Sequence, residues 1–213
     1  MATVHLMGLG PSWSLAPQCG PGVKVWSMNN VLNWRPVDYV FEVHDWYKKM
    51  NRVRQGDFHQ RAVRTAIRTG TPYIVRERYP FFPGLKQVVY PWEAVFEEFQ
   101  SDFLGCSMDC MVAMAIYCGY TDIQLYGIGI NRASHYDFQI PSMNYWMGVC
   151  HGRGINIHLN QHGGFRHTDL LRTVDGKVYG CQKPQRKWPT LDPSLPECEC
   201  VKRHDAHHCF DFK

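Results

Sequence analysis

The chain of 213 residues is 45% hydrophobic and 20% charged, and its formal net charge is +4. This composition excludes a disordered chain, and the length is enough for one well-buried domain with a small appendage. The mild positive charge suits a phosphate-bearing ligand and is far below the charge typical of nucleic-acid-binding proteins.

No apolar run approaches the roughly 20 residues that cross a bilayer, and the first residues lack the basic-then-apolar pattern of a signal peptide. We therefore expect a soluble, cytoplasmic protein without a membrane span. Of the nine cysteines, four lie in apolar, helix-like runs, which predicts small buried side chains rather than disulfides. These four are Cys106, Cys110, Cys118 and Cys150.

A short apolar run starts at Val4 and breaks into a Gly-Leu-Gly-Pro-Ser turn at residues 8–12. We interpret it as the first strand of an α/β sheet, followed by a loop that faces a phosphate. Gly8 and Gly10 lack a Cβ and let a phosphate approach the main chain, while the Ser12 hydroxyl can bind the ligand or cap the next element of the chain. An ordinary tight turn explains the same residues equally well, because short glycine motifs occur often.

Two further strands are predicted at residues 23–28 and 37–43 from their short apolar or alternating patterns. Both end in polar residues, and ligands of open α/β sheets bind at the carboxyl ends of the strands. Four side chains are therefore expected to converge near the first loop: Asn29, Asn30, His44 and Asp45. Asp45 is the best-placed carboxylate for a general base or a Mg²⁺ ligand, and a plain strand-end cap explains it as well.

Residues 57–69 have apolar side chains at helical spacing and end at Gly70, which predicts a helix with a glycine C-cap. The arginines of this helix fall on its other side and are expected to form a solvated face. The following elements are predicted to be a strand at residues 72–75, an irregular aromatic and proline-rich loop at residues 76–91, and a short helix at residues 91–99.

The clearest periodic unit is a helix over residues 107–118, a glycine stop, and a strand over residues 123–127. A polar loop at residues 131–141 comes next at the ligand edge, then a helix over residues 142–151 and a last strand over residues 155–159. The alternation of helices and strands predicts an α/β, Rossmann-like domain over residues 1–165, with a mostly parallel sheet flanked by helices.

Residues 166–213 are rich in proline and glycine and show no long apolar period, which predicts an irregular Cys/His-rich extension. Its end holds enough soft ligands for one tetrahedral, structural Zn²⁺: Cys198, Cys200, His204 and Cys209. The Cys-x-Cys spacing is tighter than the usual gap of roughly two to four residues. A catalytic zinc is not expected there, because the cluster lies outside the strand-edge region.

The segment from Ser107 to Ile128 resembles part of the bacterial sialyltransferases that use CMP-sialic acid. In those enzymes a serine precedes an alanine-rich helix, Gly-Tyr and an Ile-x-Leu-x-Gly-Ile strand. The same superfamily includes the central domain of motility-associated flagellin glycosyltransferases and the archaeal 6-hydroxymethylpterin diphosphokinases. The Gly-x-Gly-Pro-Ser turn, the strand end at Asn29 and the late strand agree in order, so the resemblance covers most of residues 3–165.

The resemblance implies roles for the matched positions. Gly8, Gly10 and Ser12 would lie along the nucleotide phosphates or ribose, and Asn29 would hydrogen-bond the nucleotide. Ser107 would contact it from a helix N-terminus, where unpaired N–H groups and the helix dipole also attract anions.

The resemblance also implies a general base. His135, in the loop after the Gly-Ile strand, would take a proton from the acceptor hydroxyl, with Tyr136 near the departing phosphate. Two positions depart from the sialyltransferase pattern: Leu9 replaces an asparagine, and Gly129 replaces an aspartate. Both changes argue against sialic acid as the donor, and neither argues against a nucleotide-binding fold.

Three functions stay open on the sequence. The leading hypothesis is a transferase that moves a sugar from a nucleotide donor to a hydroxyl. The second is a diphosphokinase-like transfer from ATP to a small heterocycle, which would require Mg²⁺. The third is a non-catalytic protein that binds a nucleotide, or contacts nucleic acid through Arg61, Arg64, Arg68, Arg76 and Arg78.

Overall fold

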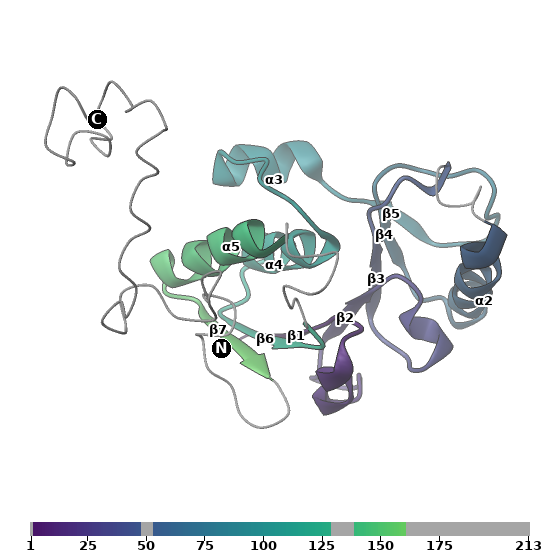
Figure 1. The fold of residues 1–213 in the computed structure, drawn as a ribbon, viewed down its shortest axis with the longest axis horizontal. Coiled ribbons are helices and arrows are strands. Elements are labelled where there is room, and N and C mark those ends of the chain that lie inside the picture. Colours follow the sequence, from purple (N-terminus) through teal and green to yellow (C-terminus); the bar gives the residue numbers. More distant parts are fainter. Residues whose placement is uncertain (1, 48–52, 129–138, 161–213) are drawn as a thin grey trace, which may run out of the picture. The chain divides into compact units, whose positions relative to one another are not determined.

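The computed structural model describes residues 2–47, 53–128 and 139–160, and it contains a seven-stranded sheet in the order β5-β4-β3-β2-β1-β6-β7 (Figure 1). Every neighbouring pair is parallel. The strands are β1 (Thr3–Met7), β2 (Val25–Met28), β3 (Tyr39–Glu42), β4 (Tyr73–Val75), β5 (Gln87–Val89), β6 (Asp122–Tyr126) and β7 (Asn156–Asn160). The predicted α/β fold with a parallel sheet is confirmed.

The helices alternate with these strands along the chain. They are α2 (Val53–Thr69), α3 (Trp92–Phe99), α4 (Ser107–Tyr117), α5 (Ile140–Gly152) and the short 3-10 helices η1 (Pro11–Leu15) and η2 (Val31–Asn33). The predicted helices all form, with their ends shifted by a few residues. None of these helices in the described part of the chain is long and apolar enough to cross a membrane.

The prediction of an irregular loop over residues 76–91 was wrong in one part, because β5 lies within it. β5 has only three residues and pairs with β4 at the edge of the sheet. Its Val88 and Val89 are both 39% exposed, so no alternation of buried and exposed residues marks the strand in the sequence. The pairing with β4, rather than the local pattern, makes it a strand.

The strands contribute side chains to two hydrophobic cores, one on each face of the sheet. Side chains alternate between the faces, so the neighbouring residues Val40 and Phe41 of β3 enter different cores. Helices α3, α4 and α5 pack on the face of Phe41, and α2 and η2 pack on the other (Figure 1). Because α4 is buried along almost its whole length, its first turn is held at the end of the central strands.

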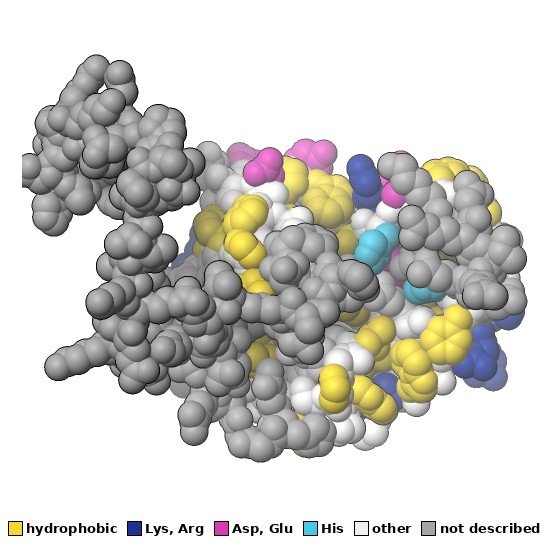
Figure 2. Space-filling view, viewed as in Figure 1, with side chains coloured by type: hydrophobic (Ala, Val, Ile, Leu, Met, Phe, Trp, Pro, Cys, Tyr) yellow, Lys and Arg dark blue, Asp and Glu magenta, His cyan; other side chains and the backbone are white. Residues whose placement is uncertain are grey.

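Helix α2 meets its core through fewer residues than its pattern predicted. Ala62, Val63 and Ala66 are buried, whereas Phe58 and Ile67 are 37% and 39% exposed. Gly70 follows the helix with a φ of 71°, as expected for a glycine C-cap. Lysine and arginine side chains gather on the side of the molecule where α2 lies (Figure 2), which agrees with the predicted solvated face formed by Arg61, Arg64 and Arg68.

The prediction of buried cysteines is confirmed only in part. Cys110 and Cys150 are buried free thiols, as expected, and Cys106 is half-buried. Cys118 is exposed, because it follows the last turn of α4 rather than lying within it. The domain boundary proposed after residue 165 and the whole extension over residues 166–213 lie outside the described residues.

Candidate functional site

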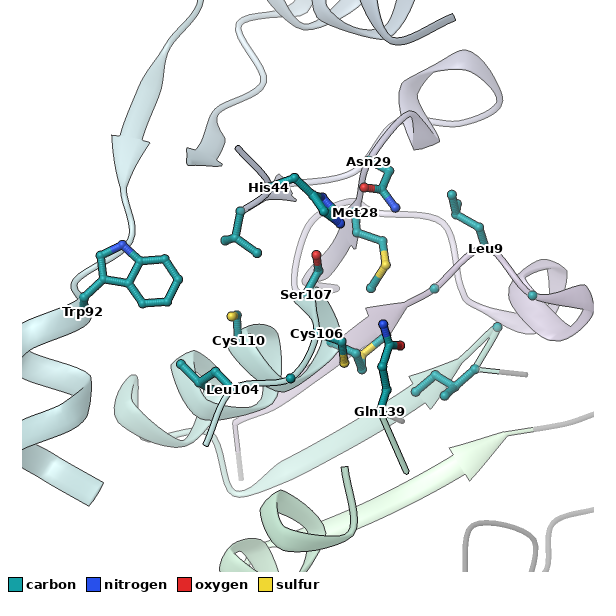
Figure 3. A pocket seen from close by; sticks show the side chains of 17 residues that line it. Leu9, Met28, Asn29, His44, Trp92, Leu104, Cys106, Ser107, Cys110 and Gln139 are labelled. Atoms are coloured by element: carbon teal, nitrogen blue, oxygen red, sulfur yellow. The ribbon is translucent and has the colours of Figure 1, made fainter. Parts of the chain in front are cut away.

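A cavity of about 720 Å³ opens at the carboxyl ends of β1, β2, β3 and β6 (Figure 3). It is lined by the loops that follow these strands and by the first turn of α4. In the sheet, β2 and β6 lie on opposite sides of β1, so the cavity sits where the strand order reverses. This is the position at which open α/β sheets bind their ligands.

The loop after β1 packs directly against the loop after β6. The Gly8 N–H donates to the Tyr126 carbonyl at 2.8 Å, and the Gly10 N–H donates to the Gly127 carbonyl at 2.7 Å. A Cβ on Gly8 would lie 2.5 Å from the Gly127 oxygen, and Gly127 itself has a φ of 62°. Both Gly8 and Gly10 line the cavity, but the close approach of the two loops already explains why glycine is needed at position 8.

Ser12 also serves this contact between the loops. Its Oγ accepts a hydrogen bond from the Gly127 N–H at 2.9 Å, and its side chain is buried. Ser12 is not among the residues that line the cavity. The structure therefore gives Ser12 a role in joining two loops, and contact of its hydroxyl with a nucleotide stays a prediction.

The N-terminus of α4 points into the cavity. Ser107 begins the helix and lines the cavity, and Figure 3 shows its hydroxyl directed into the open space. The Ser107 Oγ is buried and has no hydrogen-bond partner in the described residues. The Asp109 N–H of this first turn is already capped by the Cys106 side chain, and the helix dipole adds partial positive charge. A phosphate oxygen would satisfy the Ser107 hydroxyl.

Asp109 stabilises the start of α4 through hydrogen bonds to the backbone. Its Oδ2 accepts the N–H groups of Gly105 and Cys106 at 2.8 and 3.0 Å. Burial raises the pKa of Asp109 to about 6, although the two backbone donors oppose this shift. Burial, followed by the charge of Asp109, raises the pKa of the Cys106 thiol to about 12. The Cys106 thiol, which borders the cavity, is therefore protonated at neutral pH and is not a nucleophile.

Asn29 lines the cavity at the end of β2 in a left-handed conformation. Its φ is 55°, a region that asparagine tolerates better than most residues. Its backbone N–H donates to the Phe41 carbonyl at 3.1 Å, and its carbonyl accepts from the Tyr73 hydroxyl at 3.5 Å. These bonds to neighbouring strands fix the Asn29 backbone at the rim, next to the loop after β1 (Figure 3).

At the end of β3, the structure pairs His44 with Glu42. The His44 Nδ1 lies 2.6 Å from a carboxylate oxygen of Glu42, and His44 lines the cavity. Asp45, the carboxylate favoured by the sequence, is half-buried and is not among the lining residues. Sequence reasoning missed Glu42, yet a signal was present, because residues two apart on a strand point to the same face.

Apolar side chains also line the cavity. Met28, Val43, Trp92, Leu104 and Met108 all border the cavity. Such a mixture of apolar walls with a few convergent polar groups is typical of small-molecule sites, and the volume lies within their usual range of roughly 300–1,000 Å³. Among the described lining residues none is lysine or arginine, so the main chain, hydroxyl and amide groups would have to hold an anion.

Several predicted site residues lie outside the described residues. His135 and Tyr136 belong to the segment 129–138, whose neighbours Ile128 and Gln139 both line the cavity. The predicted zinc ligands Cys198, Cys200, His204 and Cys209 lie in the segment 161–213. Within the ranges that the structure does describe, no group of three or more His, Cys, Asp or Glu side chains could hold a metal ion.

The arginines considered for nucleic-acid contact are exposed, but they do not line the cavity. Arg61 donates to the Asn33 side chain at 3.0 Å, and its guanidinium lies 5.1 Å from the Phe58 ring centroid. Arg76 and Arg78 lie between β4 and β5. The arginines are thus spread over separate elements.

Comparisons with known proteins give no match to a protein-family model and none to a curated protein sequence. Among the solved structures that are similar, three are Campylobacter jejuni sialyltransferases. One is the sialyltransferase CstII in complex with the substrate analogue CMP-3FNeuAc, at 15% identity and a TM-score of 0.47, covering 75% of this chain and 80% of that one. The second is an alpha-2,3-sialyltransferase in apo form, at 16% identity and a TM-score of 0.45, covering 78% of this chain and 77% of that one. The third is CstII in complex with cytidine-5'-monophosphate, at 16% identity and a TM-score of 0.40, covering 78% of this chain and 82% of that one.

Proposed function

We propose that this protein is a nucleotide-dependent transferase that moves a sugar from a nucleotide-sugar donor to a hydroxyl acceptor. The observation that carries the proposal is the buried Ser107 hydroxyl, which has no partner in the described residues and faces the cavity from the N-terminus of α4. A buried hydroxyl without a hydrogen bond is unfavourable by about 1–3 kcal/mol. A bound phosphate would remove that cost.

The remaining walls of the cavity suit the other parts of a nucleotide. Trp92 and Met28 offer flat and apolar surfaces for a base, and Asn29 offers an amide at the rim. A volume of about 720 Å³ has room for more than an inorganic phosphate. The sequence resemblance of residues 107–128 to sialyltransferases favours a sugar as the transferred group.

The chemistry needs no covalent nucleophile. Transfer requires a base near the acceptor hydroxyl and an electrostatic hold on the phosphate that leaves. Ser107 and the first turn of α4 would supply the hold. His135 is the base that the resemblance implies, and it lies outside the described residues.

Calorimetric titration with CMP, UMP, UDP, GDP and ATP tests the proposal, each with and without a chelator. We expect at least one nucleotide to bind, and binding that survives chelation would separate this function from a Mg²⁺-dependent diphosphokinase. The control variant is Ser101→Ala, which removes a serine hydroxyl outside the cavity and should bind as the wild type does. Absence of binding by every nucleotide would overturn the proposal.

A further inference from the structure

A buried carboxylate stands directly behind the cavity wall, at the end of β3. The Glu42 side chain is 1% exposed, and its two oxygens lie 2.6 Å from the His44 Nδ1 and 3.8 Å from the His59 Nδ1. On the neighbouring strand, burial and the charge of Glu42 both raise the pKa of Tyr73. A carboxylate removed from water in this way depends on the N–H donors that face it.

The contact with Glu42 determines which nitrogen of the His44 ring carries the proton. When Nδ1 carries the proton and donates it to the Glu42 oxygen, Nε2 keeps its lone pair and can accept a proton. Nε2 lies on the far side of the ring from Glu42. The side chain is 53% exposed and lines the cavity, and Figure 3 shows it directed toward the space between Ser107 and Asn29.

The structure assigns His44 as the catalytic base and Glu42 as the residue that positions it, an inference that rests on the proposed transferase function. In this step the acceptor O–H proton moves to the His44 Nε2, and the freed oxygen pair forms the bond to the anomeric carbon of the donor. The bond from that carbon to the phosphate oxygen breaks, and its electron pair leaves with the nucleotide phosphate. Glu42 stabilises the imidazolium, which then releases its proton to water.

A second histidine–carboxylate pair provides a matched control. His158 on β7 lies 3.7 Å from Asp122 on β6, and its side chain is 52% exposed, almost the same as that of His44. The Asp122 carboxylate is 19% exposed, and neither residue lines the cavity. The two histidines therefore have similar exposure, and the two pairs differ in the distance between ring nitrogen and carboxylate, in the burial of the carboxylate and in access to the cavity.

Two measurements on the full chain separate this inference from the proposed function. Calorimetry with the five nucleotides measures binding, and release of nucleotide from CMP-, UDP- and GDP-sugars in water measures turnover, with water as the acceptor. His44→Gln should bind as the wild type does and lose roughly 10²–10⁴-fold in turnover. His158→Gln should be unchanged in both, and imidazole added to His44→Ala should restore part of the turnover.

The other outcomes would overturn either the proposed function or the role of His44. If no nucleotide binds the wild type, the proposed function fails, and the role of His44 fails with it. If nucleotide binds and His44→Gln keeps its turnover, His44 is not the base and the proposed function stands. Loss of turnover in His135→Gln instead would place the base there. Binding without release from any of these sugars would overturn the catalytic role and leave a binding function.

The positioning role of Glu42 needs a measurement that folding alone would not change. In ¹⁵N spectra of the histidine side chains, wild-type His44 should have its proton on Nδ1, and Glu42→Gln should move the population toward the other tautomer. Turnover of Glu42→Gln should fall, and adding His44→Gln should cost little more, because the two residues act as a unit. Glu42→Asp, which keeps the charge, provides a second folded variant. An unchanged tautomer and unchanged turnover in both would overturn the role of Glu42.

Discussion

Two turns that contain glycine and serine border the cavity, residues 8–12 after β1 and residues 105–108 at the start of α4, and their polar groups have different partners. In the first turn, Gly8, Gly10 and Ser12 all bond to the loop that follows Tyr126 or to Tyr126 itself. In the second, the Ser107 hydroxyl is buried and has no partner in the described residues. A motif of small residues can thus reflect contact between two loops, whereas an unpartnered buried hydroxyl that lines a cavity is available to a ligand.

Gly127→Ala should break the first turn and give the largest effect. The new Cβ would lie 2.6 Å from the Gly8 carbonyl oxygen, and the φ of 62° is unfavourable for alanine. Together these predict a loss of roughly 2–5 kcal/mol in the free energy of unfolding, measured by urea denaturation. Gly148→Ala is the control, because nothing lies within 4 Å of its added Cβ in α5, and it should not destabilise. Equal stabilities for the two variants would refute this explanation of the turn.

Asp109→Asn should change the pH dependence of stability, because Asp109 accepts two backbone N–H groups in the second turn. The pKa of Asp109 is about 6 in the folded protein and 3.8 in the reference state. The folded state therefore holds this proton more tightly, so the stability that the protonated group confers is present below pH 4 and is lost as the pH rises through 6. Relative to Asp109→Asn, the wild type should lose roughly 2 kcal/mol of unfolding free energy between pH 4 and 7. Parallel pH profiles of the two proteins would contradict the raised pKa.

Ser107→Ala should separate ligand binding from stability. Loss of a hydrogen bond to a charged phosphate should weaken nucleotide binding by about 1.5–3 kcal/mol, or roughly tenfold or more in Kd. The unfolding free energy without ligand should not fall, because no bond to the protein is lost in the described residues. Calorimetry and urea denaturation of the same samples provide the two readings. A loss of stability with unchanged binding would reverse the assignment of the two turns.

Ser12→Ala should show the opposite behaviour, with a smaller effect. The change leaves the Gly127 N–H without its acceptor in a buried place, which predicts a loss of about 1–2 kcal/mol in the free energy of unfolding. Nucleotide affinity should stay close to that of the wild type, because Ser12 does not line the cavity. If affinity falls as far as it does in Ser107→Ala, then the Ser12 hydroxyl contacts the ligand after all.

Most of the fold could be predicted from local patterns. The strands other than β5 carry apolar runs or alternation, and α4 is an apolar helix that ends at a glycine, so the parallel α/β sheet followed from the sequence. Edge strand β5 did not, because its two exposed valines leave no pattern and only its pairing with β4 makes it a strand. For the site, the sequence selected Gly8, Gly10, Asn29 and Ser107, and all four line the cavity. It selected Asp45 rather than Glu42, because a charged residue within a strand looks exposed until its neighbours are known.

The sequence by itself determined the order of strands and helices and brought the polar strand ends to one edge of the sheet, because periodicity and parallel topology are local or directional properties. Only the tertiary structure decided which polar groups there have partners within the described chain. Ser12 and the Gly127 N–H that it accepts from are separated by 115 positions, so no spacing rule could show that this hydroxyl is engaged. The same is true of the Ser107 hydroxyl, which lacks a partner among the described residues, and of Glu42, which lies 2.6 and 3.8 Å from two histidine nitrogens. Such contacts depend on distances in space rather than on spacing along the chain.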